Sequence, residues 1–152
     1  MKKTILTILV CGFMVLGIIG CGITKNKFDV GEKSDIEVVK NDVSLSVKEG
    51  TLTNTSATLI LTNNSDKNFY YGNSYEIETK KDGQWHKINV ELKFTMPAFG
   101  LKAKETKEIE LNWKNGYGQL ANGTYRIIKC IDYEKEEGNF ETFNVATEFT
   151  ID

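Results

Sequence analysis

The stretch LANGTYRI at residues 120–127 joins a tight turn to the start of an apolar segment. Asn122 and Gly123 are residue types that turns prefer, and Tyr125 is the first large side chain after them. The segment that follows, TYRIIKCIDY (124–133), is rich in the β-branched and aromatic residues that fit a pleated sheet. We therefore predict a turn and then a strand with Tyr125 at its beginning.

The chain on either side of this strand alternates apolar and polar residues with a period of two, from Val43 to the end. Val43, Leu45 and Val47, for example, alternate with serines, which is typical of a strand with one buried face. Turn signals such as KKDG (80–83) separate these segments at short intervals. The pattern predicts seven strands, at 43–47, 57–62, 69–80, 84–90, 105–113, 124–133 and 140–151. Their number and spacing favour an all-β, seven-stranded antiparallel sandwich.

The position of Tyr125 narrows the topology of that sandwich. Immunoglobulin-like sandwiches keep a tyrosine at this corner, and its hydroxyl bonds back to the backbone just upstream. Two residues later, where antibody domains carry a cysteine, this chain has Ile127. The alternative is a tyrosine that only fills a strand end. We favour the corner, and with it an immunoglobulin-like arrangement.

Two blocks of sequence, YYGNSYEIETKKDGQWHKI (70–88) and WKNGYGQLANGTYRIIK (113–129), together resemble a bacterial immunoglobulin-like domain of Gram-positive lipoproteins. The similar positions are Gly72, Tyr75, Ile77, Glu78, Gly83, Trp85, Tyr117, Gly118, Leu120, Gly123, Tyr125 and Arg126. The resemblance covers about residues 43–151 and implies an immunoglobulin-like fold in an extracytoplasmic protein. It implies no catalytic or ligand-binding residues. We interpret five of these positions as structural: Trp85, Tyr117, Gly118, Gly123 and Tyr125.

The first twenty residues, MKKTILTILVCGFMVLGIIG, have two lysines followed by an apolar run, which is the layout of a secretory signal. The run from Thr4 to Ile19 has 16 residues. An uncleaved anchor is the alternative, but a membrane-spanning helix needs about 20 residues. The sequence IIGC (18–21) resembles the lipobox of bacterial lipoproteins. That resemblance implies cleavage between Gly20 and Cys21 and a diacylglycerol on Cys21, whose two acyl chains, such as palmitate, anchor stably.

These features predict three parts of the chain: a helical lipoprotein signal peptide at 1–20, a lipidated tether at 21–42 and the sandwich at 43–152. The tether is polar and charged, and it can reach about 70 Å when fully extended. Residues 36–39 (IEVV) are an alternative short edge strand. We expect the protein on the extracytoplasmic face of the cell membrane.

The charge of the chain argues against a nucleic-acid partner. The formal net charge is −2, and it becomes −4 when Lys2 and Lys3 leave with the signal peptide. The remaining lysines are dispersed among acidic residues and form no basic patch. After processing and lipidation, Cys130 is the only cysteine left, so no disulfide can form within the chain.

The residues for catalysis are few. His86 is the only histidine, so a multi-histidine metal site is excluded and any catalytic triad must use that ring. A Cys130–His86 pair in an envelope enzyme or thiol redox protein is the alternative function. We expect instead that Cys130 is a small buried hydrophobe and that His86 is a surface residue of a hairpin. No cofactor is predicted.

Two segments are candidates for binding. DYEKEEGN (132–139) carries four acids, but it lacks the alternating register of a calcium loop, so we expect a solvated turn. The connector FTMPAFGL (94–101) is apolar for a loop. We expect part of it to cap the core and the rest to offer a contact to a partner. The predicted function is thus a lipid-anchored, non-catalytic domain that binds or positions an envelope protein or polysaccharide.

Overall fold

The computed structural model describes residues 28–39 and 42–152, and every regular element in these ranges is a strand. The ten strands are β1 (Asp29–Lys33), β2 (Val43–Val47), β3 (Ser56–Asn63), β4 (Phe69–Tyr71), β5 (Glu76–Lys81), β6 (Gln84–Asn89), β7 (Phe99–Leu101), β8 (Thr106–Asn112), β9 (Gly123–Glu136) and β10 (Asn139–Ile151). The all-β prediction is confirmed. The predicted signal peptide and Cys21 lie outside the described residues.

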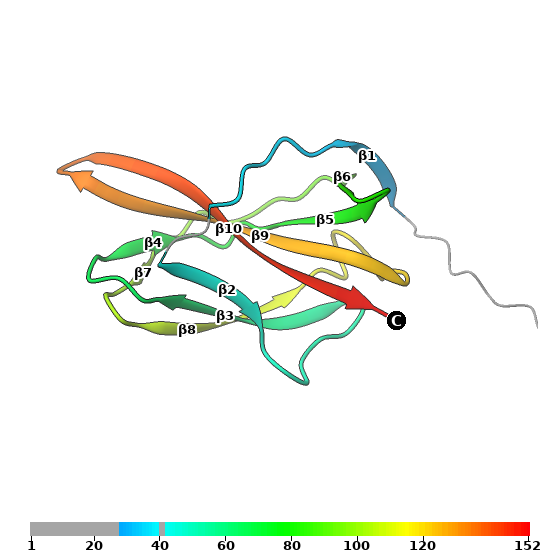
Figure 1. Ribbon diagram of the computed structural model, residues 1–152, viewed down its shortest axis with the longest axis horizontal. Helices are drawn as coiled ribbons and strands as arrows, with labels where there is room; N and C mark the ends of the chain where they lie inside the picture. Colours follow the sequence, from blue (N-terminus) through cyan, green and yellow to red (C-terminus); the bar gives the residue numbers. More distant parts are fainter. Residues whose placement is uncertain (1–27, 40–41) are drawn as a thin grey trace, which may run out of the picture.

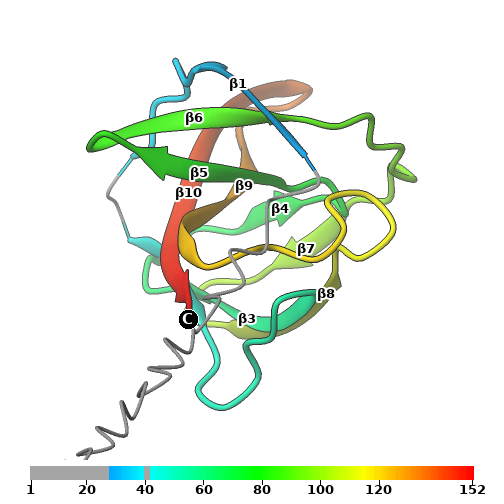
Figure 2. The same ribbon diagram turned by 90° about the vertical axis from the view of Figure 1, so that its right-hand side faces the viewer.

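The strands form two antiparallel sheets that pack face to face (Figure 1). The smaller sheet has the order β2-β3-β8. The larger sheet has the order β1-β6-β5-β9-β4-β7, and β10 pairs with the other edge of β9. The long strand β9 lies beside β5 in its first half and beside β4 further along. Figure 2, turned by 90°, shows the two layers, with β3 and β8 of the smaller sheet below β4, β5 and β6 of the larger sheet.

The hydrophobic core lies between the two sheets because alternate residues of each strand point inward. Its most buried aliphatic side chains come from β3, β5, β7 and β9: Leu59, Leu61, Ile77, Leu101, Ile127 and Ile131. Trp113 is fully buried at the end of β8, and its indole N–H donates a hydrogen bond of 2.9 Å to the carbonyl of Asn54. The core is therefore stabilised by apolar and aromatic packing. No disulfide contributes among the described residues, whose one cysteine, Cys130, is a free thiol.

Each of the seven predicted strands lies in the observed sandwich. The prediction for 69–80 covers two strands, β4 and β5, because the backbone leaves the sheet between them. The additional strands are β1 and β7, of five and three residues. β7 is too short to show a period of two, and β1 (DVGEK) has one apolar side chain, Val30, so alternation reveals neither strand.

The predicted tether is wrong for residues 28–39, which lie on the larger sheet. β1 pairs with β6 in an antiparallel register. Beyond it, the N–H of Ser34 donates to the Trp85 carbonyl at 2.8 Å, and the N–H of Val39 donates to the Asn144 carbonyl at 2.9 Å. We call residues 34–39 the strap. The described part of the folded domain thus includes residues 28–39 and does not begin at residue 43.

The strap crosses the outer face of the larger sheet, opposite to the core. Ile36 and Val38 are half-buried, whereas their neighbours Asp35 and Glu37 are exposed, so one side of the strap faces the sheet. Its hydrogen bonds go to β6 and β10, strands on opposite sides of β5 and β9. Residues 36–39 therefore form no edge strand, because they bridge separate strands instead of following one.

Candidate functional site

Tyr125 occupies the corner where β9 begins. Its hydroxyl donates a hydrogen bond of 2.8 Å to the carbonyl of Ala121, four residues upstream. The ring is fully buried and stacks on Phe149 with centroids 5.6 Å apart. A Cβ on Gly123 would lie 3.5 Å from this ring, in ordinary contact. The geometry is that of a corner tyrosine, which holds the start of β9 in place.

Tyr117 and Gly118 shape the loop between β8 and β9. The Tyr117 hydroxyl accepts the backbone N–H of Ile77 at 2.8 Å, and burial raises the pKa of Tyr117 well above its usual value. The N–H groups of Tyr117 and Gly118 donate to the carbonyl of Trp113. Gly118 has a φ of 74°, in the left-handed region that favours glycine. Tyr117 therefore ties the loop to β5, and Gly118 allows the loop to turn.

Trp85 lies on the outer face of the larger sheet, where two cations contact its ring. The guanidinium carbon of Arg126 is 4.9 Å from the ring centroid, and the Lys80 ammonium is 5.0 Å from it. Such contacts are favourable at half-exposed aromatic side chains. Trp85 therefore packs against these two cations on the outer face of the sheet, outside the core.

A buried lysine lies in the core, and sequence reasoning missed it. Lys129 is 1% exposed, and its ammonium donates to the carbonyls of Gly72 (2.5 Å) and Ser74 (2.9 Å) in the break between β4 and β5. Burial disfavours the charged form and lowers the pKa of Lys129 to about 8. The signal was present, because Lys129 stands in phase with the inward-facing Tyr125 and Ile127.

The structure does not bring Cys130 and His86 together. The register pairs His86 with Thr79, and Thr79 with Tyr125, whose side chain faces the core. Cys130 lies five residues after Tyr125 on the same strand, so its side chain points to the opposite face. Cys130 is half-buried rather than fully buried, and burial raises the pKa of its thiol. The His86 ring lies 3.3 Å from the carbonyl of Gly31.

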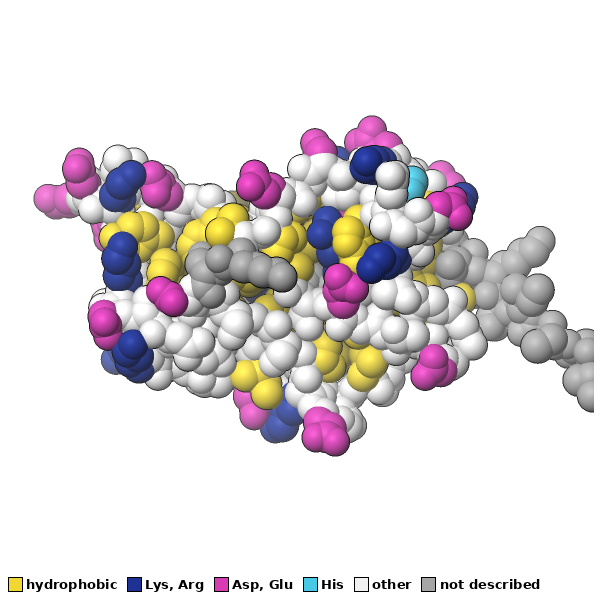
Figure 3. Space-filling view, viewed as in Figure 1, with side chains coloured by type: hydrophobic (Ala, Val, Ile, Leu, Met, Phe, Trp, Pro, Cys, Tyr) yellow, Lys and Arg dark blue, Asp and Glu magenta, His cyan; other side chains and the backbone are white. Residues whose placement is uncertain are grey.

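The acidic segment 132–139 is a turn only at residues 137–138, because residues 132–136 belong to β9 and pair with β10. Glu134 accepts the N–H of Gly138 at 3.0 Å, and Asp132 accepts the hydroxyl of Thr142 at 2.7 Å. Across residues 28–39 and 42–152, no three His, Cys, Asp or Glu side chains are grouped to hold a metal ion. Figure 3 shows acidic and basic side chains interspersed on one face of the molecule.

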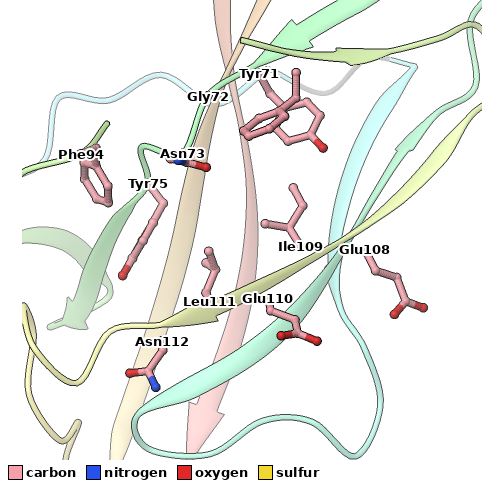
Figure 4. Close-up of a pocket in the computed structure, with 11 residues that line it drawn as sticks. Tyr71, Gly72, Asn73, Tyr75, Phe94, Glu108, Ile109, Glu110, Leu111 and Asn112 are labelled. Atoms are coloured by element: carbon pink, nitrogen blue, oxygen red, sulfur yellow. The ribbon is translucent and has the colours of Figure 1, made fainter. Parts of the chain in front are cut away.

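A groove of about 460 Å³ opens between the two sheets, beside β8 (Figure 4). Six of the residues that line it are aromatic or aliphatic: Tyr71, Tyr75, Phe94, Phe99, Ile109 and Leu111. Figure 4 shows Ile109 and Leu111 pointing toward the tyrosines, whereas Glu108 and Glu110 point away from them. Asn73 and Asn112 add polar groups to the lining. This groove is the candidate binding site.

The connector 94–101 forms one wall of this groove. Leu101 is fully buried in the core, and the Phe94 ring packs 5.2 Å from that of Tyr75. Met96 is 97% exposed and Phe99 is 41% exposed. The connector thus both caps the core and offers apolar side chains to solvent.

Within the described ranges no helix is long and apolar enough to cross a bilayer. Gly20 and Cys21, the predicted cleavage and lipidation positions, lie outside these ranges, so cleavage and lipidation stay predictions.

The family of the chain follows from comparison with known proteins. The family model described as a bacterial Ig-like domain matches residues 39–150, from the end of the strap almost to the end of β10. No curated protein and no solved structure matches the chain. The family match covers most of the chain and agrees with the two antiparallel sheets and the corner at Tyr125. The chain belongs to the bacterial Ig-like domain family.

Proposed function

We propose that this protein is anchored by a lipid on the extracytoplasmic face of the bacterial cell membrane, where it binds or positions a cell-envelope protein or polysaccharide without catalysing a reaction. Membership of the bacterial Ig-like family supports an extracellular, non-catalytic domain. The observation that carries the anchor is the sequence IIGC (18–21) at the end of an apolar run, seven residues before Phe28.

The anchor would hold one end of the sandwich close to the membrane. Six residues, 22–27, separate Cys21 from Phe28, and they span at most about 23 Å at roughly 3.3 Å per residue. The Phe28 ring packs edge-on against Tyr125, 6.4 Å between centroids, at the start of β9. The tip of the β9–β10 hairpin lies at the opposite end of the domain (Figure 1). The hairpin would therefore point away from the membrane, and the reach is shorter than the 70 Å expected for a longer tether.

A binding role is supported by the aromatic groove and the exposed side chains next to it. Met96 and Phe99 expose apolar surface beside the groove, and binding to a partner would remove that surface from water. The alternative thiol function has less support, because Cys130 and His86 face opposite sides of the larger sheet.

Detergent-phase partitioning of the full chain from cells tests the anchor. We expect Cys21→Ala to move the protein from the detergent phase to the aqueous phase. The matched control is Cys11→Ala, which removes a thiol inside the predicted signal and should stay in the detergent phase. A Cys21→Ala protein that still partitions into detergent would show that another feature holds it at the membrane.

Photo-crosslinking on intact cells tests the partner. A photoreactive residue in place of Met96, beside the groove, should capture a discrete envelope component. The same residue in place of Glu137, which is exposed in the β9–β10 turn, is the control. Equal products from both positions, or none from Met96, would contradict a binding role for the groove.

A further inference from the structure

β8 has one edge that pairs with no strand in the described part of the chain. Its other edge pairs with β3, and the N–H of Trp113 donates to the Thr55 carbonyl just beyond the strand. At the opposite end, the N–H of Asn63 donates to the Glu105 carbonyl. Odd-numbered residues therefore bond to β3. Because antiparallel hydrogen bonding alternates, the N–H and C=O groups of four even-numbered residues point outward: Thr106, Glu108, Glu110 and Asn112.

The groove runs along this open edge. Residues 108–112 of β8 form one side of it, and Ile109 and Leu111 send their side chains into it. Tyr71, Tyr75 and Phe99 of the other sheet and its loops stand opposite. A strand added beside β8 would place every second side chain against these rings. Backbone hydrogen bonds and pockets for alternate side chains are the two requirements of β-strand addition.

The charges on β8 indicate which strand fits. The solvent-side residues of β8 include Glu108 and Glu110. A second copy of β8 in antiparallel pairing would set glutamates opposite or diagonal to glutamates, which is unfavourable. Lys48 lies 2.8 Å from Glu108, whereas Glu110 has no ion-pair partner among the described residues. A strand with lysine or arginine on its solvent side would therefore complement this edge.

We infer that the open edge of β8 takes up one extended polypeptide strand of an envelope protein, in antiparallel pairing, with apolar residues in the groove and Lys or Arg on the solvent side. This rests on the proposed binding role but not on the lipid anchor. If Cys21 were not lipidated, β8 could still bind a strand. If the protein were lipidated but β8 bound no strand, only this inference would be refuted.

Binding of synthetic peptides to the full chain in detergent tests the inference. The probe is a capped heptapeptide of alternating valine and lysine, which matches the seven residues of β8. The control replaces each lysine by glutamate. We expect at least tenfold weaker binding of the glutamate peptide. Equal binding of both peptides, or no binding of the lysine peptide, would overturn the inference.

Backbone methylation of the peptide separates strand addition from simple charge attraction. In an antiparallel pair, the peptide residues opposite Glu108, Glu110 and Asn112 are the lysines, and their N–H groups point to β8. N-methylation of the lysines should therefore abolish binding, whereas N-methylation of the valines should preserve most of it. Strand addition would be overturned if binding were lost with neither methylated peptide or with both. This test needs no variant protein.

A charge reversal places the site on the protein. Glu110→Lys should weaken binding of the lysine peptide at least tenfold and favour the glutamate peptide. Glu137→Lys makes the same charge change in the distant β9–β10 turn and should leave both affinities nearly unchanged. Equal effects of the two variants would show attraction to net charge only. If the groove bound an N-acetylglucosamine oligosaccharide but not the lysine peptide, strand addition would be refuted and the groove would be a sugar site.

Discussion

Arg126 of β9 and Glu78 of β5 form an ion pair on the outer face of the larger sheet, with Nη2 and Nε of the arginine 2.6 and 2.7 Å from the same carboxylate oxygen. The two residues are direct partners in the register of β5 and β9. Glu78 is 1% exposed, and Nη2 of Arg126 also lies 3.4 Å from the Ser34 hydroxyl and 3.5 Å from the Ile36 carbonyl. The strap therefore covers a charged pair.

Arg126→Met should destabilise the domain strongly. The substitution leaves the Glu78 carboxylate buried without its partner, which typically lowers the free energy of unfolding by about 3–5 kcal/mol. Urea denaturation measures the effect. The control is Lys48→Met, which breaks an exposed ion pair with Glu108 and should cost less than about 1 kcal/mol. Similar losses from both variants would contradict the buried pair.

Tyr125→Phe should lower the free energy of unfolding by about 1 kcal/mol, because the Ala121 carbonyl loses its hydrogen-bond donor while the ring packing remains. Tyr133→Phe is the control, since the Tyr133 ring contacts Phe69 and the Lys67 ammonium, and a phenylalanine ring would keep both contacts. Chemical denaturation with an unchanged slope gives the comparison. An unchanged midpoint for Tyr125→Phe would argue against the corner.

Lys129 should make stability depend on pH between about 8 and its unfolded pKa of about 10.5. In this window the folded protein has released the Lys129 proton, whereas the unfolded chain still binds it, so stability rises with pH. The expected measurement is a free energy of unfolding that increases from pH 8 to 10 in the wild type relative to Lys129→Met. The difference between the two proteins removes the contribution of the tyrosines. Parallel pH profiles would rule out a lowered pKa for Lys129.

Gly118→Ala should destabilise the domain because Gly118 has a φ of 74°, and the left-handed region costs a residue with a Cβ about 1–2 kcal/mol. Gly100→Ala is a matched control. A Cβ would meet nothing within 4 Å at either position, but Gly100 has no positive φ. Thermal unfolding should show a lower midpoint for Gly118→Ala only. Equal midpoints would mean that backbone strain at Gly118 is unimportant.

The sequence determined the features that depend on local order along the chain. Alternation from Val43 onward located most of the strands and their buried faces, though not β7, because a period of two follows from the geometry of one strand. The turn before Tyr125 placed a ring at a strand start, and the observed hydrogen bond to Ala121 agrees with that position. The resemblance to a bacterial immunoglobulin-like domain agrees with the family match over residues 39–150.

Only the tertiary structure decided which segments meet. The strap has the composition of a tether, and its place on the sheet depends on partners such as Trp85 and Asn144 that lie far along the chain. The same holds for Lys129, whose acceptors are the carbonyls of Gly72 and Ser74. The edge of β8 is open because β8 pairs with β3 on one side and with no described strand on the other. Alternation specifies which side of a strand is buried, but its hydrogen-bonding partners are set by long-range packing of the two sheets.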